Sequence, residues 1–124
     1  MTVLTGPLGE RRAIIDRRMV ADQIAALPGA GIQAATTEIL AEALAIGRAQ
    51  IAEQFALHPG SGRAAAASYA FLTEQVVRLS FDFVRSRLYP NPNPTTAERI
   101  ALVGLGGTGR AEMAPYSDLD LMFL

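Results

Sequence analysis

Two groups of residues near the end of the sequence have the types and spacing that chemistry requires. Gly104, Gly106 and Gly109 follow an apolar run in a G-x-G-x-x-G pattern, which is typical of a loop that binds a dinucleotide. Asp118 and Asp120 flank a single apolar residue, and such a pair is typical of a site for a divalent cation. The two patterns predict different chemistries, so their surroundings must decide between them.

The surroundings disfavour a dinucleotide site. A dinucleotide-binding fold needs a helix between its first two strands and an acidic residue at the far end of the second strand. Only eight residues lie between Gly109 and Asp118, and Pro115 is one of them, whereas a crossover with its helix takes at least about 10 to 12 residues. The acids also precede the apolar run 121–124 instead of following it. A dinucleotide-dependent oxidoreductase therefore ranks last among the candidate functions.

The two aspartates fit a site for Mg²⁺ that is bound to nucleotide phosphates. Residues two apart in a strand project from the same face, with α-carbons about 6.6 Å apart. In a strand over 118–124, the carboxylates of Asp118 and Asp120 would converge on one hard cation, with room for a third ligand. Three apolar side chains of the same strand would point the other way, into a core: Leu119, Leu121 and Phe123.

The glycines and three polar residues fit the phosphates of the same nucleotide. Gly106 and Gly107 have no side chains, so their backbone N–H groups could approach a triphosphate closely at the start of a short helix. Arg110 is placed to contact the same phosphates or to pair with Glu112, which is interpreted as a residue that holds the loop. Ser117 would either orient the first aspartate or cap the turn before it.

With these residues in view, the segment resembles a known superfamily. Gly106-Gly107, followed after ten residues by Asp118-Leu119-Asp120, is similar to the signature of polymerase-β-type nucleotidyltransferases. The fuller string GGTGRAEMAPYSDLDL resembles one branch, the bacterial PII uridylyltransferase/uridylyl-removing enzymes, whose motif is G-G-x-G-R-x-E-x-x-P-x-S-D-x-D-L. Thr108 and Ala111 depart from the aromatic residue and the glycine that are usual there. The matching residues are Gly106, Gly107, Gly109, Arg110, Glu112, Pro115, Ser117, Asp118, Asp120 and Leu121.

The resemblance implies a Mg²⁺-dependent enzyme that transfers UMP from UTP to a tyrosine of the nitrogen-regulatory PII protein and releases pyrophosphate. Asp118 and Asp120 would then be the catalytic metal ligands. The nucleotide-binding residues would be Gly106, Gly107, Arg110 and Ser117. Family members are bifunctional: they also remove UMP by hydrolysis, and they sense glutamine as an effector, through domains that are not in this sequence. They place a third carboxylate on a later strand, so we expect an N-terminal fragment that is inactive alone.

Two related interpretations stay open. Glutamine synthetase adenylyltransferases share the Gly-Gly and Asp-x-Asp frame, although their flanking residues differ from GGTGR and APYSD. A nucleotide-binding sensor or regulatory module of the same superfamily would dock a partner through its helices and would use the sheet only to sense a nucleotide. An acidic residue on a following strand would support catalysis, and its absence would support a sensor.

Helices must position this segment, and three are predicted ahead of it, at about 10–27, 34–57 and 63–88. In the second helix, apolar residues that include Ile46 and Phe55 fall near one face of a 3.6-residue period. The third helix carries two neighbouring apolar stripes, one through Leu72 and Leu79 and one through Phe81. This width predicts that the third helix is buried on more than one side.

The predicted fold is α+β and has three parts. They are a helical region over 1–89, a proline-rich linker over 90–97, and the start of a polymerase-β-like nucleotidyltransferase domain over 98–124. The linker holds three prolines in five residues, which a helix cannot accommodate. The elements expected in the last part are a strand over 100–105, a turn that opens a short helix over 106–113, and a strand over 118–124.

The composition indicates a soluble, cytoplasmic protein. Its 11 basic and 12 acidic residues give a net charge of -1, which leaves no basic surface for nucleic acid or for an anionic membrane. There is no cysteine, which excludes disulfides and thiolate metal sites, and no segment approaches the roughly 18 to 20 apolar residues of a membrane span. His58 is interpreted as a surface loop residue, and the arginines at 11, 12, 17 and 18 as a solvated face without a function.

Overall fold

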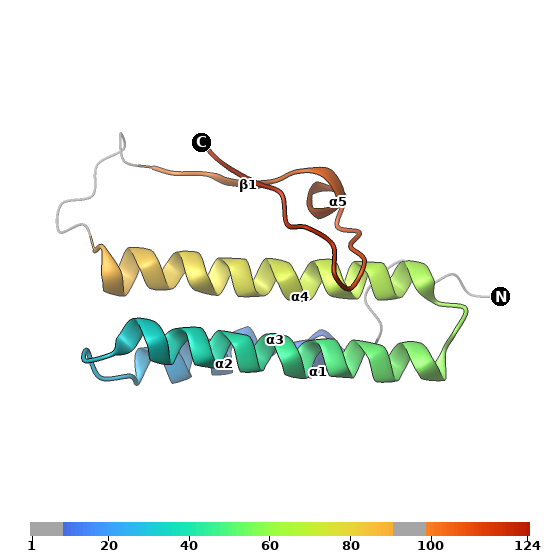
Figure 1. Ribbon diagram of the computed structural model, residues 1–124, viewed down its shortest axis with the longest axis horizontal. Coiled ribbons are helices and arrows are strands. Elements are labelled where there is room, and N and C mark those ends of the chain that lie inside the picture. Colours follow the sequence, from blue (N-terminus) through green and yellow to red (C-terminus); the bar gives the residue numbers. More distant parts are fainter. Residues whose placement is uncertain (1–8, 91–98) are drawn as a thin grey trace.

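The computed structural model describes residues 9–90 and 99–124. Within them the fold is mostly helical, with a two-stranded antiparallel sheet near the C-terminal end (Figure 1). This agrees with the predicted α+β class. The elements in chain order are α1 (Arg11–Ile14), α2 (Arg17–Ala25), α3 (Ile32–Leu57), α4 (Gly62–Phe83), the π-helical turn η1 (Val84–Leu88), β1 (Leu102–Gly104), α5 (Gly106–Gly109) and β2 (Leu121–Phe123).

Two helices, α1 and α2, replace the single helix predicted over 10–27. Ile15 takes an extended backbone conformation, which ends α1. Asp16 then caps α2, because its carboxylate accepts a hydrogen bond from the backbone N–H of Met19 at 3.2 Å. The break allows Ile14 and Ile15, which are consecutive, to be buried together, at 1% and 7% exposure. A continuous helix would turn two consecutive side chains about 100° apart.

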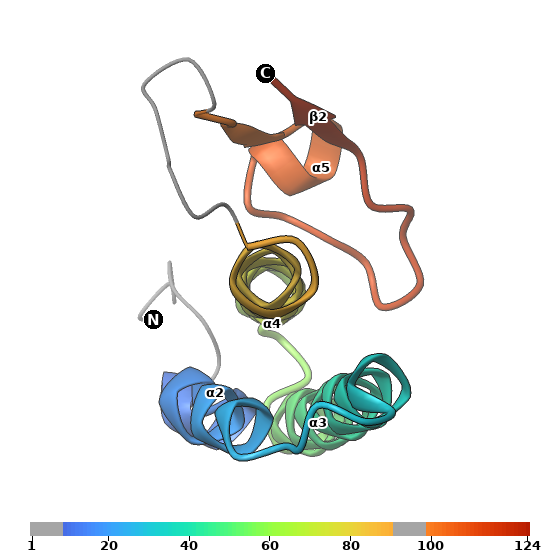
Figure 2. The same cartoon turned by 90° about the vertical axis from the view of Figure 1, so that its left-hand side faces the viewer.

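The long helices α3 and α4 lie side by side and run in opposite directions (Figures 1 and 2). Gly47 sits at a close approach between them. A β-carbon at Gly47 would lie 2.6 Å from a methyl group of Leu72 and 2.9 Å from the backbone oxygen of Ile14. Glycine is therefore required for α1, α3 and α4 to meet at this point.

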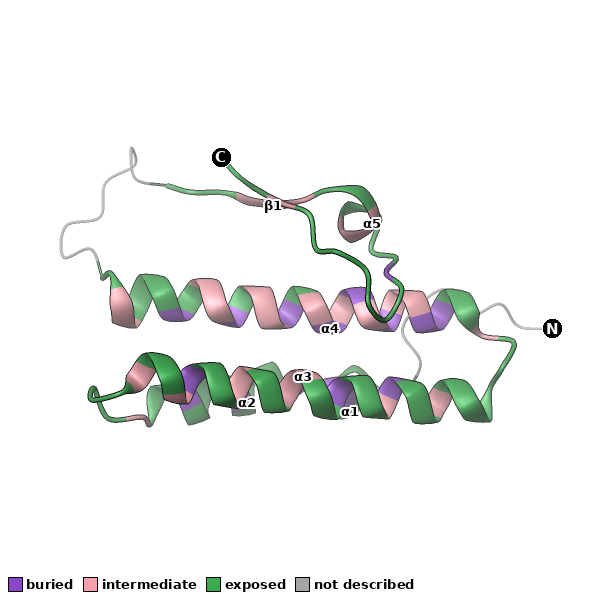
Figure 3. Ribbon diagram, in the orientation of Figure 1, coloured by how far each residue is buried: buried purple, intermediate pink, exposed green. Residues whose placement is uncertain are grey.

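The apolar core lies between the helices, and Figure 3 shows buried residues along the inner sides of α3 and α4. Its buried members are Ile14, Ile15, Val20, Ile24, Ile51, Leu72, Leu79 and Phe83. The face predicted for α3 is wrong in part, because Ile46 is 58% exposed and Phe55 is 40% exposed. Apolar residues surround this helix, so periodicity alone does not select the side that meets α4.

Helix α4 is the central element, as its two apolar stripes predict. Figure 2 shows α4 between a layer of α2 and α3 on one side and the β1–α5–β2 unit on the other. Leu72 and Leu79 face the helical core, whereas Val77 and Phe81 line a cavity beneath the sheet. The prediction of burial on more than one side is therefore confirmed.

After α4 the chain continues through the π-helical turn η1, which closes with a hydrogen bond from the N–H of Tyr89 to the carbonyl of Val84 at 2.8 Å. Arg87 of this turn reaches the end of α2. Its guanidinium donates to the carbonyls of Ala25 at 3.3 Å and Leu27 at 3.1 Å. These bonds satisfy carbonyl groups that a helix end leaves without partners, and they fix the end of α4 against α2.

Strands β1 and β2 pair in the register Leu102↔Phe123, Val103↔Met122 and Gly104↔Leu121. Several contacts hold the β1–α5–β2 unit on α4, and two of them involve Met113 and Phe123. The N–H of Met113 donates to the carbonyl of Ala66 at 3.1 Å, and the rings of Phe81 and Phe123 lie 6.4 Å apart. The long helix therefore serves as the platform of the glycine turn and its aspartates.

The strands are shorter than predicted. Backbone hydrogen bonds between Ala101 and Leu124, and from Leu105 to Asp120, extend the pairing by one residue at each end. Most of the predicted linker, at 91–97, lies outside the described residues. None of the helices in the described ranges is both long and apolar enough to span a membrane.

Candidate functional site

The glycine turn starts where β1 ends. Gly106 has a φ of +56°, a conformation that side-chain-bearing residues rarely adopt, and it turns the chain from the strand into α5. The short helix is closed by hydrogen bonds from the N–H of Gly109 to the carbonyl of Leu105 at 3.0 Å and from Arg110 to Gly106 at 3.1 Å. The N–H groups of Gly106 and Gly107 donate to no partner within the described residues. They are the donors that a phosphate would need.

The other glycines of the turn allow the backbone to pack against itself. A β-carbon at Gly107 would lie 2.7 Å from the carbonyl oxygen of Glu112, and one at Gly109 would lie 2.7 Å from that of Gly104. Real β-carbons essentially never come this close to another atom. The spacing of the glycines thus has a packing cause in this fold, with no dinucleotide required.

Asp120 lies directly beside the glycine turn. Its carbonyl accepts a hydrogen bond from the N–H of Leu105 at 2.9 Å, so it continues the ladder of the two strands. Its carboxylate oxygen Oδ2 is 3.2 Å from the position that a β-carbon on Gly106 would occupy. The structure therefore brings Asp120 and Gly106 together, as the sequence predicts.

Asp118 is placed differently from the prediction. The strand expected over 118–124 begins only at Leu121, and Asp118 is an exposed residue of the segment before it. The physical reason is the turn at Gly106, which carries the chain away into α5 and leaves no strand residues opposite Asp118. The strand geometry that would align the two carboxylates ends at Asp120, and the role of Asp118 as a ligand stays a prediction.

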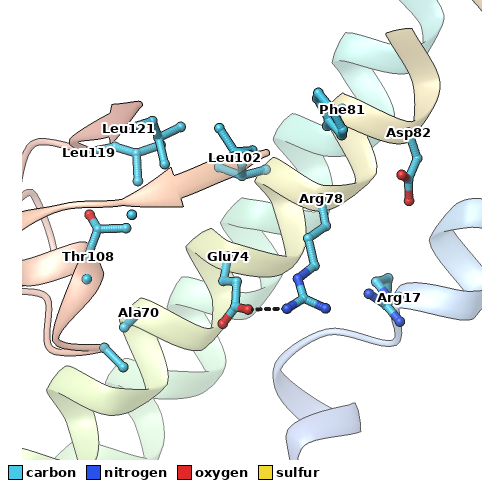
Figure 4. A pocket seen from close by; sticks show the side chains of 14 residues that line it. Arg17, Ala70, Glu74, Arg78, Phe81, Asp82, Leu102, Thr108, Leu119 and Leu121 are labelled. Atoms are coloured by element: carbon cyan, nitrogen blue, oxygen red, sulfur yellow. Dashed lines mark hydrogen bonds and ion pairs between the residues drawn. The ribbon is translucent and has the colours of Figure 1, made fainter. Parts of the chain in front are cut away.

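The apolar residues of the same segment face α4 but are not buried in a core. Leu119 is 39% exposed and Phe123 is 64% exposed, so the prediction of a core position is wrong for both. Leu119 and Leu121 line a cavity of about 580 Å³ between the sheet and α4, shown in Figure 4. A single helix covers this face of the sheet, and it leaves the edge residues open to solvent.

The cavity and the side chain of Asp120 lie on different sides of the sheet. Figure 4 shows Leu102, Leu119 and Leu121 on the sheet side, with the ion pair of Glu74 and Arg78 on the side of α4. Successive residues of a strand point to opposite faces, so the side chain of Asp120 points away from the cavity that Leu121 lines. The cavity is thus not the predicted metal site.

Arg110, Glu112 and Ser117 each have a definite place. Glu112 forms an ion pair with Arg63 of α4 at 3.8 Å, which fits its predicted role of holding the loop. Arg110 is exposed, and its Nη2 lies 3.9 Å from a β-carbon placed on Gly107. The hydroxyl of Ser117 accepts a hydrogen bond from the N–H of Ala114 at 2.9 Å, so Ser117 caps the turn before the aspartates.

Among the described residues, no group of three or more histidine, aspartate or glutamate side chains could hold a metal ion. Of the two predicted ligands, Asp120 is the one whose carboxylate the structure places beside the glycine turn. Carboxylate oxygens are the ligands that Mg²⁺ prefers, so their chemistry fits this ion. The assignment of the metal to Asp118 and Asp120 remains a prediction.

Met113 is a structural residue of the site that sequence reasoning missed. It is 6% exposed, its N–H binds the carbonyl of Ala66, and its sulfur lies 3.8 Å from the hydroxyl of Thr108. Thr108 also fills the space beside Gly104, which explains how the loop accommodates this departure from the motif. The sequence does give a signal for the burial of Met113, because it is a single large apolar residue among charged and turn-forming residues.

The chain is similar to proteins named bifunctional uridylyltransferase/uridylyl-removing enzyme. It is 44% identical over 117 residues to that of Erythrobacter litoralis, 41% over 120 residues to that of Novosphingobium aromaticivorans, and 38% over 118 residues to that of Rhodospirillum rubrum. The matches cover 92%, 94% and 91% of this chain but only 13% of each relative. No family model matches the chain, and no solved structure does. The resemblance predicted from the motif is confirmed, and it extends over the helices.

Proposed function

We propose that the chain provides the helical region and the first part of the catalytic domain of a nucleotidyltransferase that uridylylates a PII signalling protein. The domain would have the polymerase-β-like fold, of which β1, α5 and β2 are the start. The similarity over at least 91% of the chain in three relatives supports this proposal, because it includes both the helices and the motif. The chain spans 13% of those relatives, so the whole enzyme would need further segments.

The observation that carries the proposal is the position of Asp120. Its carboxylate lies against Gly106, at the start of a turn whose backbone N–H groups have no partner within the described residues. A cation held by this carboxylate would thus stand next to donors for the phosphates of a nucleotide. The carboxylate of Asp120 would then hold the metal on one side of the triphosphate, and the backbone N–H groups would donate hydrogen bonds to the phosphates on the other.

The proposed reaction transfers UMP from UTP to the hydroxyl of a tyrosine. The tyrosine oxygen forms a bond to the α-phosphorus and its proton passes to solvent. The bond from the α-phosphorus to the oxygen that bridges to the β-phosphorus breaks, and pyrophosphate leaves with that oxygen. Mg²⁺, when bound, supplies charge neutralisation at the phosphates. Asp118 and Asp120 would hold it, and the N–H groups of Gly106 and Gly107 would orient the phosphates, with Arg110 beside them.

Other features of such an enzyme are part of the same proposal. Hydrolytic removal of UMP, response to glutamine, and activity in the cytoplasm would belong to the whole protein. The names of the relatives support both the transfer and the removal of uridylyl groups. Ser117 would serve by fixing the turn that presents the aspartates, in addition to any contact with the nucleotide.

A chimeric enzyme tests the proposal. The matching segment of the Erythrobacter litoralis protein is replaced by this chain, and transfer of label from α-³²P-UTP to a PII protein is measured. We expect the chimera to label PII, and we expect Asp118→Asn and Asp120→Asn to reduce labelling to background because each removes a metal ligand.

The matched control is Asp22→Asn, which removes the same charge from an exposed position of α2 and should leave labelling intact. Full labelling by the Asp120→Asn chimera would contradict the proposed role of this carboxylate.

A further inference from the structure

A second pocket is lined by residues of α1, of α4 and of the loop after α5, and four of these residues are arginines. Its volume is about 420 Å³, within the range of pockets that bind small molecules. Its arginines come from three separate parts of the chain: Arg11 from α1, Arg63 and Arg78 from α4, and Arg110 from the loop after α5. We refer to it as the arginine pocket. Neither aspartate of the candidate metal site lines it.

The positive charge of the arginine pocket is only half compensated. Two carboxylates line it, and each already has a partner: Glu112 pairs with Arg63 at 3.8 Å and Glu74 pairs with Arg78 at 2.6 Å. Within the described ranges, the guanidinium groups of Arg11 and Arg110 have no carboxylate partner. Two unpaired positive charges in one pocket attract an anion.

Gln75 is an independent sign of a ligand. It lines the arginine pocket from α4, it is only 8% exposed, and its amide makes no hydrogen bond to any other described residue. Thr36 Oγ1 is the only fully buried side-chain nitrogen or oxygen without a partner among the described residues, so the amide of Gln75 meets the open space of the pocket. A polar ligand can replace water at this amide. The NH₂ group of Gln75 can donate to an anion that the arginines attract.

The contact between Arg11 and Phe71 in the lining of the pocket supports the same interpretation. The guanidinium of Arg11 lies over the ring of Phe71, 5.2 Å from its centre. This cation–π contact restrains the guanidinium, whose N–H groups have no carboxylate partner within the described ranges. An arginine held in this way is prepared for bidentate contact with phosphate oxygens.

We propose that the arginine pocket binds a diphosphate group, either as free pyrophosphate or as part of a nucleoside diphosphate. The two unpaired guanidinium groups, from α1 and from the loop after α5, supply one cation for each of two linked phosphates, and Gln75 adds a neutral donor from the same pocket. Arg110 lines this pocket and is also the residue that the proposed function places beside the nucleotide phosphates, so the two proposals share it. Binding in the arginine pocket itself requires no metal. A bound ligand would tie α1, α4 and the glycine loop together.

The test is calorimetric titration of the full chain with pyrophosphate, in EDTA and at low ionic strength. We expect saturable binding that Arg11→Ala weakens at least tenfold, because it removes an unpaired guanidinium. Gln75→Leu should weaken binding several-fold while it leaves the net charge unchanged. The matched control is Arg12→Ala, which removes the same charge from the next residue of α1 but lies outside the pocket, and which should change the affinity less than twofold.

Two further measurements separate this pocket from the candidate metal site and from a loss of folding. Asp120→Asn should leave pyrophosphate binding unchanged, whatever it does to uridylyl transfer. Arg11→Lys keeps the charge but loses the bidentate geometry, and should still weaken binding if the circular dichroism spectrum matches that of the unmodified chain. Titration with UDP and with ADP decides whether the pocket prefers free pyrophosphate or a nucleoside diphosphate. A nucleotide that binds more tightly than pyrophosphate would indicate contacts to its base or ribose.

Three results would overturn the proposal. The first is an absence of pyrophosphate binding by the unmodified chain. The second is an equal loss of affinity in Arg12→Ala and Arg11→Ala, which would indicate attraction by net charge alone. The third is a clear change of pyrophosphate affinity in Asp120→Asn under EDTA, in particular tighter binding once this negative charge is removed, which would place the anion at the glycine turn.

Discussion

The helical region and the β1–α5–β2 unit are stabilised in different ways. Among residues 9–90 and 99–124, eleven of the twelve buried apolar residues belong to the helices or the turns between them, and the twelfth is Met113. The β1–α5–β2 unit instead depends on backbone hydrogen bonds and on glycines that let one backbone segment approach another, as at Gly107 and Gly109. The comparison teaches that the helices form a platform, while the candidate site is shaped by the fit of its backbone.

Truncation of an apolar residue should damage the helical region most. Leu72 is 1% exposed and contacts the helical core, so Leu72→Ala should lower the free energy of unfolding by about 2 to 5 kcal/mol. The measurement is urea denaturation followed by circular dichroism. The matched control, Leu57→Ala, changes a residue that is 65% exposed and should cost at most about 0.5 kcal/mol. Equal losses in the two variants would contradict the placement of the core.

Addition of a methyl group should damage the glycine turn instead. Gly107→Ala would place a β-carbon 2.7 Å from the carbonyl oxygen of Glu112, so the loop must move, at a cost of about 1 to 3 kcal/mol. We expect faster hydrogen exchange at the amide of Glu112, which binds the carbonyl of Gly107.

Protection in the helices should change little in that variant, because they do not depend on the turn. Gly60→Ala is the control, since a β-carbon there meets nothing within 4 Å. If exchange at Glu112 were the same in both variants, the close packing of the turn would be wrong.

A substitution at Thr36 should change the free energy of unfolding by less and should raise it. Its side chain is 1% exposed, and its hydroxyl has no hydrogen-bond partner among the described residues. Thr36→Val removes this unsatisfied group with little change of shape, and should raise the free energy of unfolding by about 1 kcal/mol. Thr37→Val is the control, because that exposed hydroxyl is bonded to the carbonyl of Gln33. A destabilised Thr36→Val variant would indicate a partner for the hydroxyl.

The sequence predicts which sides of a helix are buried best where an apolar stripe extends over several turns. The two stripes of α4, through Leu72 and through Phe81, extend over several turns, and they correctly indicate a helix buried on two sides. On α3, apolar residues are too numerous for periodicity to choose a face, and Ile46 consequently points to solvent. Burial at such a position depends on which helix packs there, which local sequence does not determine.

The candidate site shows the same limit at shorter range. The proximity of Asp120 to Gly106 follows from the motif and the strand, and the structure agrees. The expected strand at Asp118 does not form, because the length of a strand depends on its partner, and the partner β1 ends at Gly104, before the turn at Gly106. The packing role of Gly107 was equally hidden, since the oxygen that it approaches belongs to a residue beyond the turn.

The most direct test of the proposed site is paramagnetic broadening of backbone amide resonances by Mn²⁺ in the presence of UTP. We expect the amides of Gly106 and Gly107 to broaden first, and we expect the effect to disappear in Asp120→Asn but to persist in Asp22→Asn. Broadening that survives in Asp120→Asn, or that centres on Arg11 and Gln75 instead of the glycine turn, would contradict a metal-nucleotide site between Asp120 and the glycines.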